Sequence, residues 1–290
     1  MDPVLSMYIA QGIHGLAYGM ILFLIASGLN MIFGMMGILN LTHTSFFMLA
    51  AYFGYQVTVM TGSFWIALII APICTAFVGI ILERFFLHKI ESLGHMGQLI
   101  LTFGASMVVL GAIKIFWGTE SHFIKMPPIL QGSISIAGFS YPNYRLFIIV
   151  LSLTVLAFMS IVLYKTRLGK IVQAAVSDAE MVSALGIKTP VIFMLIFGLG
   201  TWMAGVAGVV IAPILSVFPG LDTIVGMDAF IVVVTGGLGS VMGAFIVAII
   251  FGLLSSYGVQ FVSQLAPLLM VGFMAIVLAI KPTGLMGDRE

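Results

Sequence analysis

Apolar residues form long runs along this chain, separated by short polar or glycine-rich segments. The run from Leu146 to Tyr164 carries no charge, and it is close to the ~20 residues that a helix needs to cross the hydrocarbon core of a bilayer. Together the runs predict an all-α, polytopic integral membrane protein with about 8–9 transmembrane segments, built as a single permease domain over residues 1–290. The predicted spans are 8–29, 44–61, 64–87, 97–117, 146–164, 190–213, 226–237, 241–258 and 263–280.

The run 226–237 is too short to cross a membrane alone. Unpaired backbone groups in lipid cost several kcal/mol each, so a short helix must be covered by other helices or line a cavity. We therefore expect a short or broken helix near 226–240. Asp222 and Asp228 lie on either side of its N-terminal end. We expect Asp228 in its first turn, where the helix dipole favours a carboxylate. A proton-relay role for Asp228 is the alternative.

The composition excludes a soluble protein and a nucleic-acid partner. Hydrophobic residues make up 61% of the chain and charged residues 7%, against roughly 25% charged in soluble domains. The net charge of +1 provides no basic face for phosphates. The single cysteine, Cys74, excludes an intrachain disulfide, and its apolar surroundings predict a buried side chain.

Basic residues are divided unequally between the two sides if the predicted spans alternate. Lys114, Lys125 and Arg145 fall on one side, and the larger group marks the cytoplasmic side by the positive-inside rule. This places the N-terminus outside and the C-terminus in the cytoplasm. The larger group comprises Arg84, Lys89, Lys165, Arg167, Lys170, Lys188, Lys281 and Arg289.

Segment 166–190 is the longest predicted cytoplasmic loop. Apolar residues recur in it at helical spacing, for example Val172, Ala175 and Ala179. A second helical turn could begin at Ser177 or Asp178 and end at Gly186. A structured loop is suited to docking a partner, whereas a merely solvated loop is the alternative.

Three clusters interrupt or pattern the apolar runs. Residues Gly200, Ala204, Gly208 and Ala212 are spaced by four and share one helix face, which favours close helix packing within the chain, against a partner subunit or against a moving helix. The second cluster is rich in glycine, and it either lines a solute pathway or allows tight helix packing. The third cluster is polar, and its side chains either line the pathway or form hydrogen bonds with neighbouring helices. The candidate pathway residues of the two clusters are Asn30, Asn40, His43, Thr44, Gly236, Gly237, Gly239 and Ser240.

Signatures of catalysis are missing from the sequence. It contains no GxxxxGK[ST], GxSxG or HExxH pattern and no paired intramembrane carboxylates. We therefore expect no enzymatic activity, no cofactor and no metal site in this chain. The competing hypotheses are an ion-coupled secondary transporter, with Asp228 as its acidic residue, and a membrane-embedded enzyme with an unrecognised site.

Five segments, in this order, resemble the H-type permease subunits of branched-chain amino-acid ABC importers: SGLNMIFGMMGILNLTH, FFLHKIESLGHMGQLILTFGAS, TRLGKIVQAAVSDAEMVSALGI, GGLGSVMGA and KPTGLMG. The resemblance implies a subunit in the bacterial inner membrane that translocates a small polar solute. Branched-chain or related amino acids are the implied substrates, with amides, urea and aromatic or organic acids as alternatives.

The same resemblance implies an M-type permease partner, two ATP-binding subunits that hydrolyse ATP, and an external solute-binding protein. Segment 166–190 would then be the cytoplasmic coupling segment, seated in a groove of an ATPase subunit. The implied coupling residues are Arg167, Gly169, Lys170, Ala174, Ala175, Asp178, Glu180, Leu185 and Gly186.

Overall fold

The computed structural model describes residues 3–136 and 139–287, and nearly all of its regular structure is helical. Its α-helices are α1 (Pro3–Met36), α2 (His43–Thr61), α3 (Phe64–Leu82), α4 (Gly94–Trp117), α5 (Asn143–Lys165), α6 (Arg167–Ser177), α7 (Ala179–Ala184), α8 (Thr189–Ile211), α9 (Leu221–Gly236), α10 (Val241–Val262) and α11 (Ala266–Ile280). A π-helical segment, η1 (Glu83–Leu87), and the 3-10 turns η2 (His88–Leu93), η3 (Pro128–Leu130) and η4 (Ser263–Leu265) lie between them. The all-α membrane fold predicted from the sequence is confirmed.

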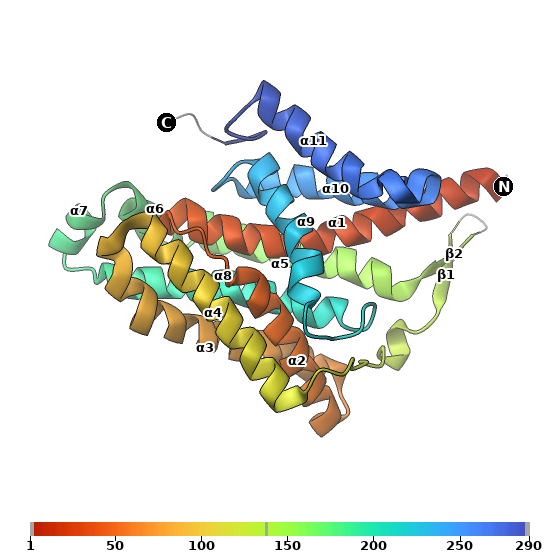
Figure 1. Ribbon diagram of the computed structural model, residues 1–290, viewed down its shortest axis with the longest axis horizontal. Coiled ribbons are helices and arrows are strands. Elements are labelled where there is room, and N and C mark those ends of the chain that lie inside the picture. Colours follow the sequence, from red (N-terminus) through yellow and green to blue (C-terminus); the bar gives the residue numbers. More distant parts are fainter. Residues whose placement is uncertain (1–2, 137–138, 288–290) are drawn as a thin grey trace.

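One small hairpin departs from the helical pattern. Strands β1 (Ser133–Ile136) and β2 (Phe139–Pro142) pair antiparallel, with Ser133 opposite Pro142. The hairpin leads directly into α5, at the end of the molecule where the N-terminus also lies (Figure 1).

Six segments of the described chain are long and apolar enough to cross a membrane: Met7–Met36, Phe64–Ile90, Gly94–Trp117, Asn143–Lys165, Thr189–Ile211 and Val241–Ile280. The last of these contains both α10 and α11. Helices α2 and α9 fall outside this set, and α9 has only 16 residues, in accord with the short helix expected near 226–240.

The start of α9 corrects one expectation. The helix begins at Leu221, so Asp222 occupies the first turn and Asp228 lies near the middle of the helix. The predicted start was too late because the apolar run from which it was predicted begins only at Gly226. The Asp228 carboxylate accepts a hydrogen bond from the Tyr18 hydroxyl of α1 at 2.5 Å.

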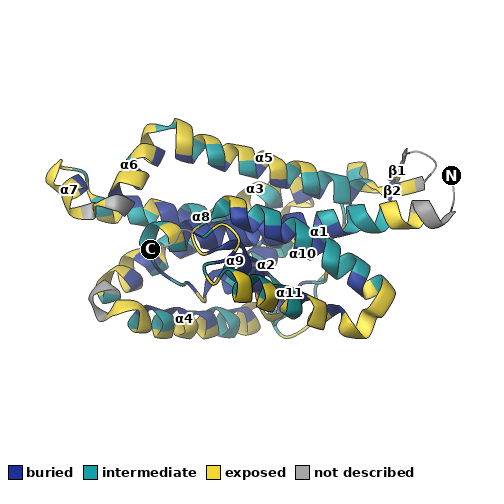
Figure 2. Cartoon of the chain, turned by 90° about the horizontal axis from the view of Figure 1, so that it is seen from above, coloured by how far each residue is buried: buried dark blue, intermediate teal, exposed yellow. Residues whose placement is uncertain are grey.

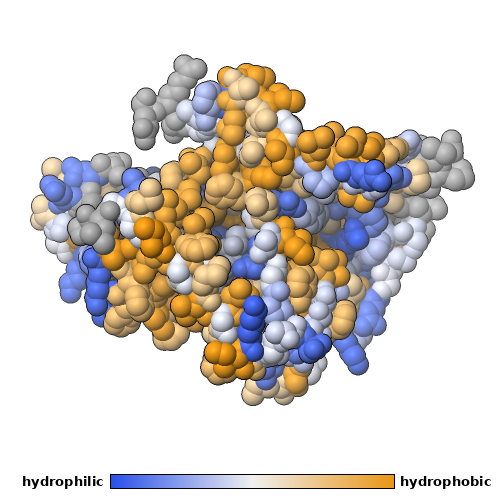
Figure 3. All heavy atoms as spheres, in the orientation of Figure 1, coloured by the Kyte–Doolittle hydropathy of each residue, from blue (hydrophilic) through white to orange (hydrophobic). Residues whose placement is uncertain are grey.

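Helices α1, α5, α8 and α10 run roughly along the long axis of the molecule, and α3 and α4 lie oblique to it (Figure 1). Helices α6 and α7 lie at one end and the N-terminus and hairpin at the other, while α9 crosses between them (Figure 1). Helices α1 and α8 carry much of the buried surface, and the outer helices expose many of their residues (Figure 2). Apolar residues predominate across the middle of the face in Figure 3. This is the surface distribution that lipid or other subunits would cover.

The prediction that Cys74 is buried is wrong. The side chain is exposed on α3, whose outer face also exposes Ile69, Ile73 and Phe77. In a membrane protein an apolar neighbourhood does not imply burial within the chain, because lipid solvates apolar side chains as well. Of the basic residues assigned to the cytoplasmic side, Arg289 lies outside the described residues.

The small-residue face of α8 packs inside the chain. Gly200 lies against the Gly28 carbonyl and Ile32 of α1, and Gly208 lies against the Phe47 carbonyl of α2. Ala204 and Ala212, the other members of the face, are also buried. These small side chains let α8 approach two helices at backbone distance.

Replacing Gly208 with alanine is expected to lower the free energy of unfolding by about 1–2 kcal/mol, because the added methyl group would collide with the Phe47 carbonyl oxygen. Gly111→Ala in α4 is the matched control, since an added Cβ there meets no atom within 4 Å. The control should be neutral or slightly stabilising. Thermal unfolding of both variants in detergent measures the difference, and equal effects would contradict the packing described here.

Candidate functional site

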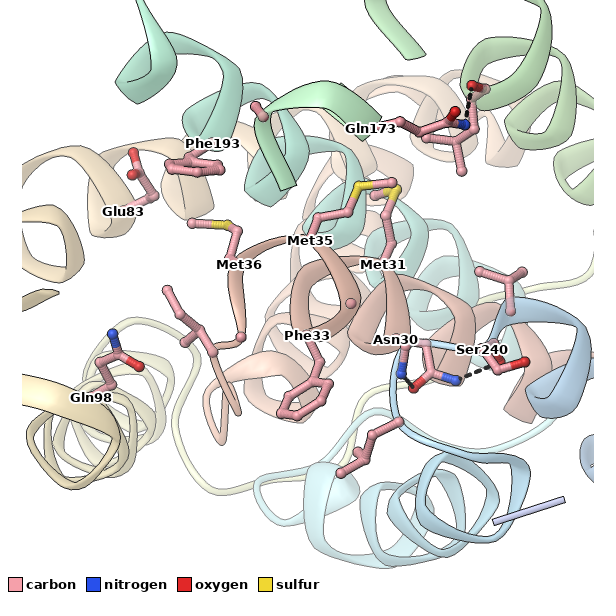
Figure 4. A pocket seen from close by; sticks show the side chains of 18 of the residues that line it. Asn30, Met31, Phe33, Met35, Met36, Glu83, Gln98, Gln173, Phe193 and Ser240 are labelled. Atoms are coloured by element: carbon pink, nitrogen blue, oxygen red, sulfur yellow. Dashed lines mark hydrogen bonds between the residues drawn. The ribbon is translucent and has the colours of Figure 1, made fainter. Parts of the chain in front are cut away.

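A large cavity of about 1060 Å³ opens at the end of the molecule that carries α6 and α7. Its walls come from the end of α1, the segment Glu83–Gln98, the junction of α5 with α6, the start of α8, and the turn between α9 and α10. Residues that line it and are labelled in Figure 4 are Asn30, Met31, Phe33, Met35, Met36, Glu83, Gln98, Gln173, Phe193 and Ser240. The cavity therefore combines flexible thioether side chains with a few polar groups.

The turn between α9 and α10 forms one wall of this cavity. Gly237 and Gly239 have φ angles of +104° and +85°, which side chains other than glycine rarely adopt. Asn30 holds the turn, because its Nδ2 donates to the Ser240 carbonyl oxygen at 2.9 Å and its Oδ1 accepts from the Gly239 amide at 3.3 Å (Figure 4). Asn30 is fully buried in the chain.

The segment that contains Leu285 and Met286 caps the C-terminal end of α9. The amides of Leu285 and Met286 donate to the carbonyl oxygens of Thr235 and Gly236 at 2.8 and 3.0 Å. These bonds satisfy carbonyl groups that the end of a helix would otherwise leave unpaired. From the sequence, KPTGLMG was identified only by its resemblance to the family. In the structure this segment caps the C-terminal end of α9.

A second interruption, residues 37–42, connects α1 to α2. The Thr42 hydroxyl donates to the Thr102 carbonyl oxygen of α4 at 2.6 Å, and Asn40 Oδ1 accepts from the Thr42 amide at 3.0 Å. His43 is fully buried, and its Nε2 donates to the Ile25 carbonyl oxygen at 3.1 Å. This cluster joins three helices by hydrogen bonds within the bundle.

The structure thus separates the candidate pathway residues into two groups. Asn30, Gly239 and Ser240 line the large cavity. The others stand behind its walls or in the helix junctions that support it: Asn40, His43, Thr44, Gly236 and Gly237. Thr44, for example, packs against Gly226 of α9.

Two polar cavity residues were missed by the sequence analysis. Glu83 and Gln98 are both buried, on η1 and α4, and both line the large cavity. Gln98 Oε1 has no hydrogen-bond partner among the described residues. Their position at the ends of apolar runs was the available signal, because a polar side chain beside a membrane-spanning helix needs a polar environment.

The predicted helical character of segment 166–190 is confirmed. Thr166 Oγ1 accepts from the Gly169 amide at 3.2 Å at the start of α6, and Asp178 Oδ1 accepts from the Met181 amide at 2.8 Å at the start of α7. These are N-cap contacts of the usual kind. Gly186 follows α7 with a φ angle of +82°.

Most of the predicted coupling residues lie on the surface of this segment. Gly169 and Ala175 are buried, and a side chain at Gly169 would collide with the Leu163 carbonyl, so glycine permits the tight junction between α5 and α6. Leu185 is 73% exposed. The exposed residues of the set are Arg167, Lys170, Ala174, Asp178, Glu180, Leu185 and Gly186.

We define the α6–α7 surface as these exposed residues together with Leu168 and Met181, which are 50% and 59% exposed. Large apolar side chains among charged ones on a preformed projection are typical of a protein-docking surface. Within residues 3–136 and 139–287, no group of three or more His, Cys, Asp or Glu side chains is placed to hold a metal ion.

Comparison with known proteins adds a family context. Residues 12–280 match the family model described as branched-chain amino acid transport system / permease component. The high-affinity branched-chain amino acid transport system permease protein BraD of Pseudomonas aeruginosa is 27% identical over 99% of this chain and 98% of its own length. The corresponding protein LivH of Escherichia coli K12 is 25% identical, over 98% of this chain and 96% of its own length.

A solved structure also resembles the fold. PsaBC from Streptococcus pneumoniae, in complex with Fab, superposes with a TM-score of 0.50 and covers 93% of this chain and 91% of that one. The sequences are 11% identical, so the likeness concerns the fold alone.

Proposed function

Because this chain belongs to the family of permease components of branched-chain amino acid transport systems, we propose that it translocates branched-chain or related amino acids as one membrane-spanning subunit of an ATP-driven importer. It is a multi-pass membrane permease and not an enzyme, in accord with its family and its apolar helices. The observation that carries the proposal is the family match over residues 12–280. The relatives named above favour the importer over the ion-coupled secondary transporter.

The proposed assembly contains an M-type permease subunit, two ATP-binding subunits and an external solute-binding protein. ATP would be bound by the partners, with no cofactor in this chain. The proposed location is the bacterial inner membrane, with the N-terminus outside and α6 and α7 in the cytoplasm. The cluster of basic residues around α6 supports this orientation.

The position of α6 supports the proposed coupling role of segment 166–190. Helix α6 carries both surface residues and cavity residues, because Gln173 and Ala175 line the large cavity. Gln173 Nε2 also donates to the Leu163 carbonyl oxygen of α5 at 3.1 Å. A partner that moves the α6–α7 surface would therefore move a wall of the cavity with it. ATP-driven closure would open and close the solute route in this way.

Uptake into vesicles tests the proposal. Proteoliposomes that contain the complete complex, internal ATP and external solute-binding protein are expected to accumulate radiolabelled leucine, and unlabelled isoleucine or valine should compete. Urea at the same concentration serves as the control competitor and should have little effect. Leucine uptake driven by an ion gradient without ATP would instead support a secondary transporter.

A further inference from the structure

A small cavity of about 330 Å³ lies at the other end of the molecule from α6 and α7. It is formed by the first half of α1, the first turns of α5, the end of α8 and the second half of α10. Its lining residues include Gln11, His14, Tyr18, Arg145, Ile148 and Ile211. The volume is near the lower end of the roughly 300–1,000 Å³ typical of small-molecule sites.

Among the described residues that line this cavity, Arg145 alone carries a permanent positive charge. Its guanidinium contacts His14 Nδ1, and the Tyr141 hydroxyl approaches the same nitrogen at 3.4 Å. Among the described residues no carboxylate forms an ion pair with Arg145. Arg145 lies in the first turn of α5 and is only partly exposed. A guanidinium that faces a mostly apolar space is suited to bind an anionic group through charge-assisted hydrogen bonds.

The remaining walls of the small cavity are mainly apolar. Ile214 and Leu215, which follow α8, line it with accessible side chains, and the buried residues Ile21, Ile148 and Ile211 complete the wall. Tyr18 also lines the cavity, and because its hydroxyl donates to Asp228, its oxygen keeps lone pairs that can accept from an ammonium group. The guanidinium of Arg145, the hydroxyl oxygen of Tyr18 and an isoleucine-rich wall therefore surround one space.

We propose that the small cavity binds a free apolar amino acid, with Arg145 holding its α-carboxylate and the isoleucines contacting its side chain. Arginine suits this role because its planar fork binds carboxylates through two hydrogen bonds. The site would receive the solute before it reaches the large cavity. This inference rests on the proposed function, since it names the first contact that the transported solute makes with this chain.

Direct binding to the complete purified complex tests the inference. The complex is placed in lipid nanodiscs without nucleotide or solute-binding protein, and radiolabelled leucine is titrated. Arg145→Gln is expected to weaken leucine binding about 10- to 100-fold, as for the loss of a charge-assisted hydrogen-bonded pair. Arg145→Lys keeps the charge but not the fork, so its affinity should be intermediate. Lys125→Gln, at an exposed position outside the cavity, is the matched control and should bind as the wild type does.

Leucinamide provides a second readout, because it lacks the carboxylate but keeps the side chain. It should compete with leucine poorly for the wild-type complex. Equal affinity of the wild type and Arg145→Gln, or equal competition by leucinamide and leucine, would overturn the inference. Arg145-dependent retention of an anionic phospholipid in place of leucine would also overturn it.

The two proposals fail in different ways. A wild-type complex that imports leucine with ATP but shows no Arg145-dependent leucine binding would refute the small-cavity site and leave the proposed function standing. A wild-type complex that imports no amino acid with ATP would refute the proposed function itself.

Discussion

Replacing Leu185 with glutamate is expected to reduce ATP-driven uptake at least about 100-fold while the protein still folds and inserts. The side chain is 73% exposed, so the change costs the isolated chain little. At a partner interface the same carboxylate would be buried without a counter-ion, and such a charge costs several kcal/mol. A loss of about 2.7 kcal/mol in the docking step already corresponds to a 100-fold effect.

The measurement for Leu185→Glu is uptake and ATP hydrolysis in proteoliposomes, with the amount of each subunit recovered by affinity purification. Ile129→Glu is the matched control, because Ile129 is 78% exposed and lies on η3, away from α6 and α7 (Figure 1). We expect normal uptake by the control and loss of the ATP-binding subunits from Leu185→Glu. If both variants transport equally well, the α6–α7 surface does not dock the ATPase.

Asn30→Leu is expected to destabilise the chain by about 2–4 kcal/mol and to abolish most transport. The change removes both hydrogen bonds between α1 and the turn at Gly239 and Ser240. Leaving a buried polar group unpaired costs about 1–3 kcal/mol, and two backbone groups lose their partner here. Because this turn is a wall of the large cavity, its displacement should also change the solute route.

Ser27→Ala is the control for Asn30→Leu. Ser27 is also buried on α1, but its hydroxyl bonds to the Leu24 carbonyl of the same helix, so alanine should cost less than about 1 kcal/mol. Thermal unfolding in detergent gives the stability difference, and uptake gives the functional one. Unfolding temperatures that coincide for the two variants would contradict the role assigned to Asn30.

The elements that hydrophobicity and local patterns define were predictable from the sequence. Apolar runs located the long helices, and the length of the run 226–237 identified α9 as a short helix. The spacing of Val172 and Ala175, together with Asp178 and Gly186, predicted the helices α6 and α7 of segment 166–190. In each case the signal lies within a few residues of the element that it predicts.

What the sequence did not reveal depends on contacts between distant segments. Asn30 was recognised as a polar interruption, but its bonds to a turn more than 200 residues away were not. The capping of α9 by Leu285 and Met286 is of the same kind. The burial of Glu83 and the exposure of Cys74 depend on which face of a helix meets protein. In lipid, both faces can be apolar, so periodicity does not distinguish them.

The two cavities support the transport hypothesis by their positions along the molecule. The large cavity opens beside α6 and α7, and the small cavity lies at the other end. Helix α1 contributes to both cavities and packs along α10 through Gly15, Gly19 and Gly252. A shift of α1 relative to α10 would therefore change both cavities together, as alternating access requires.

Identification of the proteins that co-purify with this chain tests whether it works as one subunit of an ATP-driven importer. The tagged chain is solubilised in mild detergent from its native host, and the subunits of the recovered complex are identified and counted. We expect a second permease subunit and two ATP-binding subunits, and we expect the ATP-binding subunits to be lost when Leu185 is replaced with glutamate. Recovery of the chain alone, still able to transport the solute, would contradict the importer hypothesis.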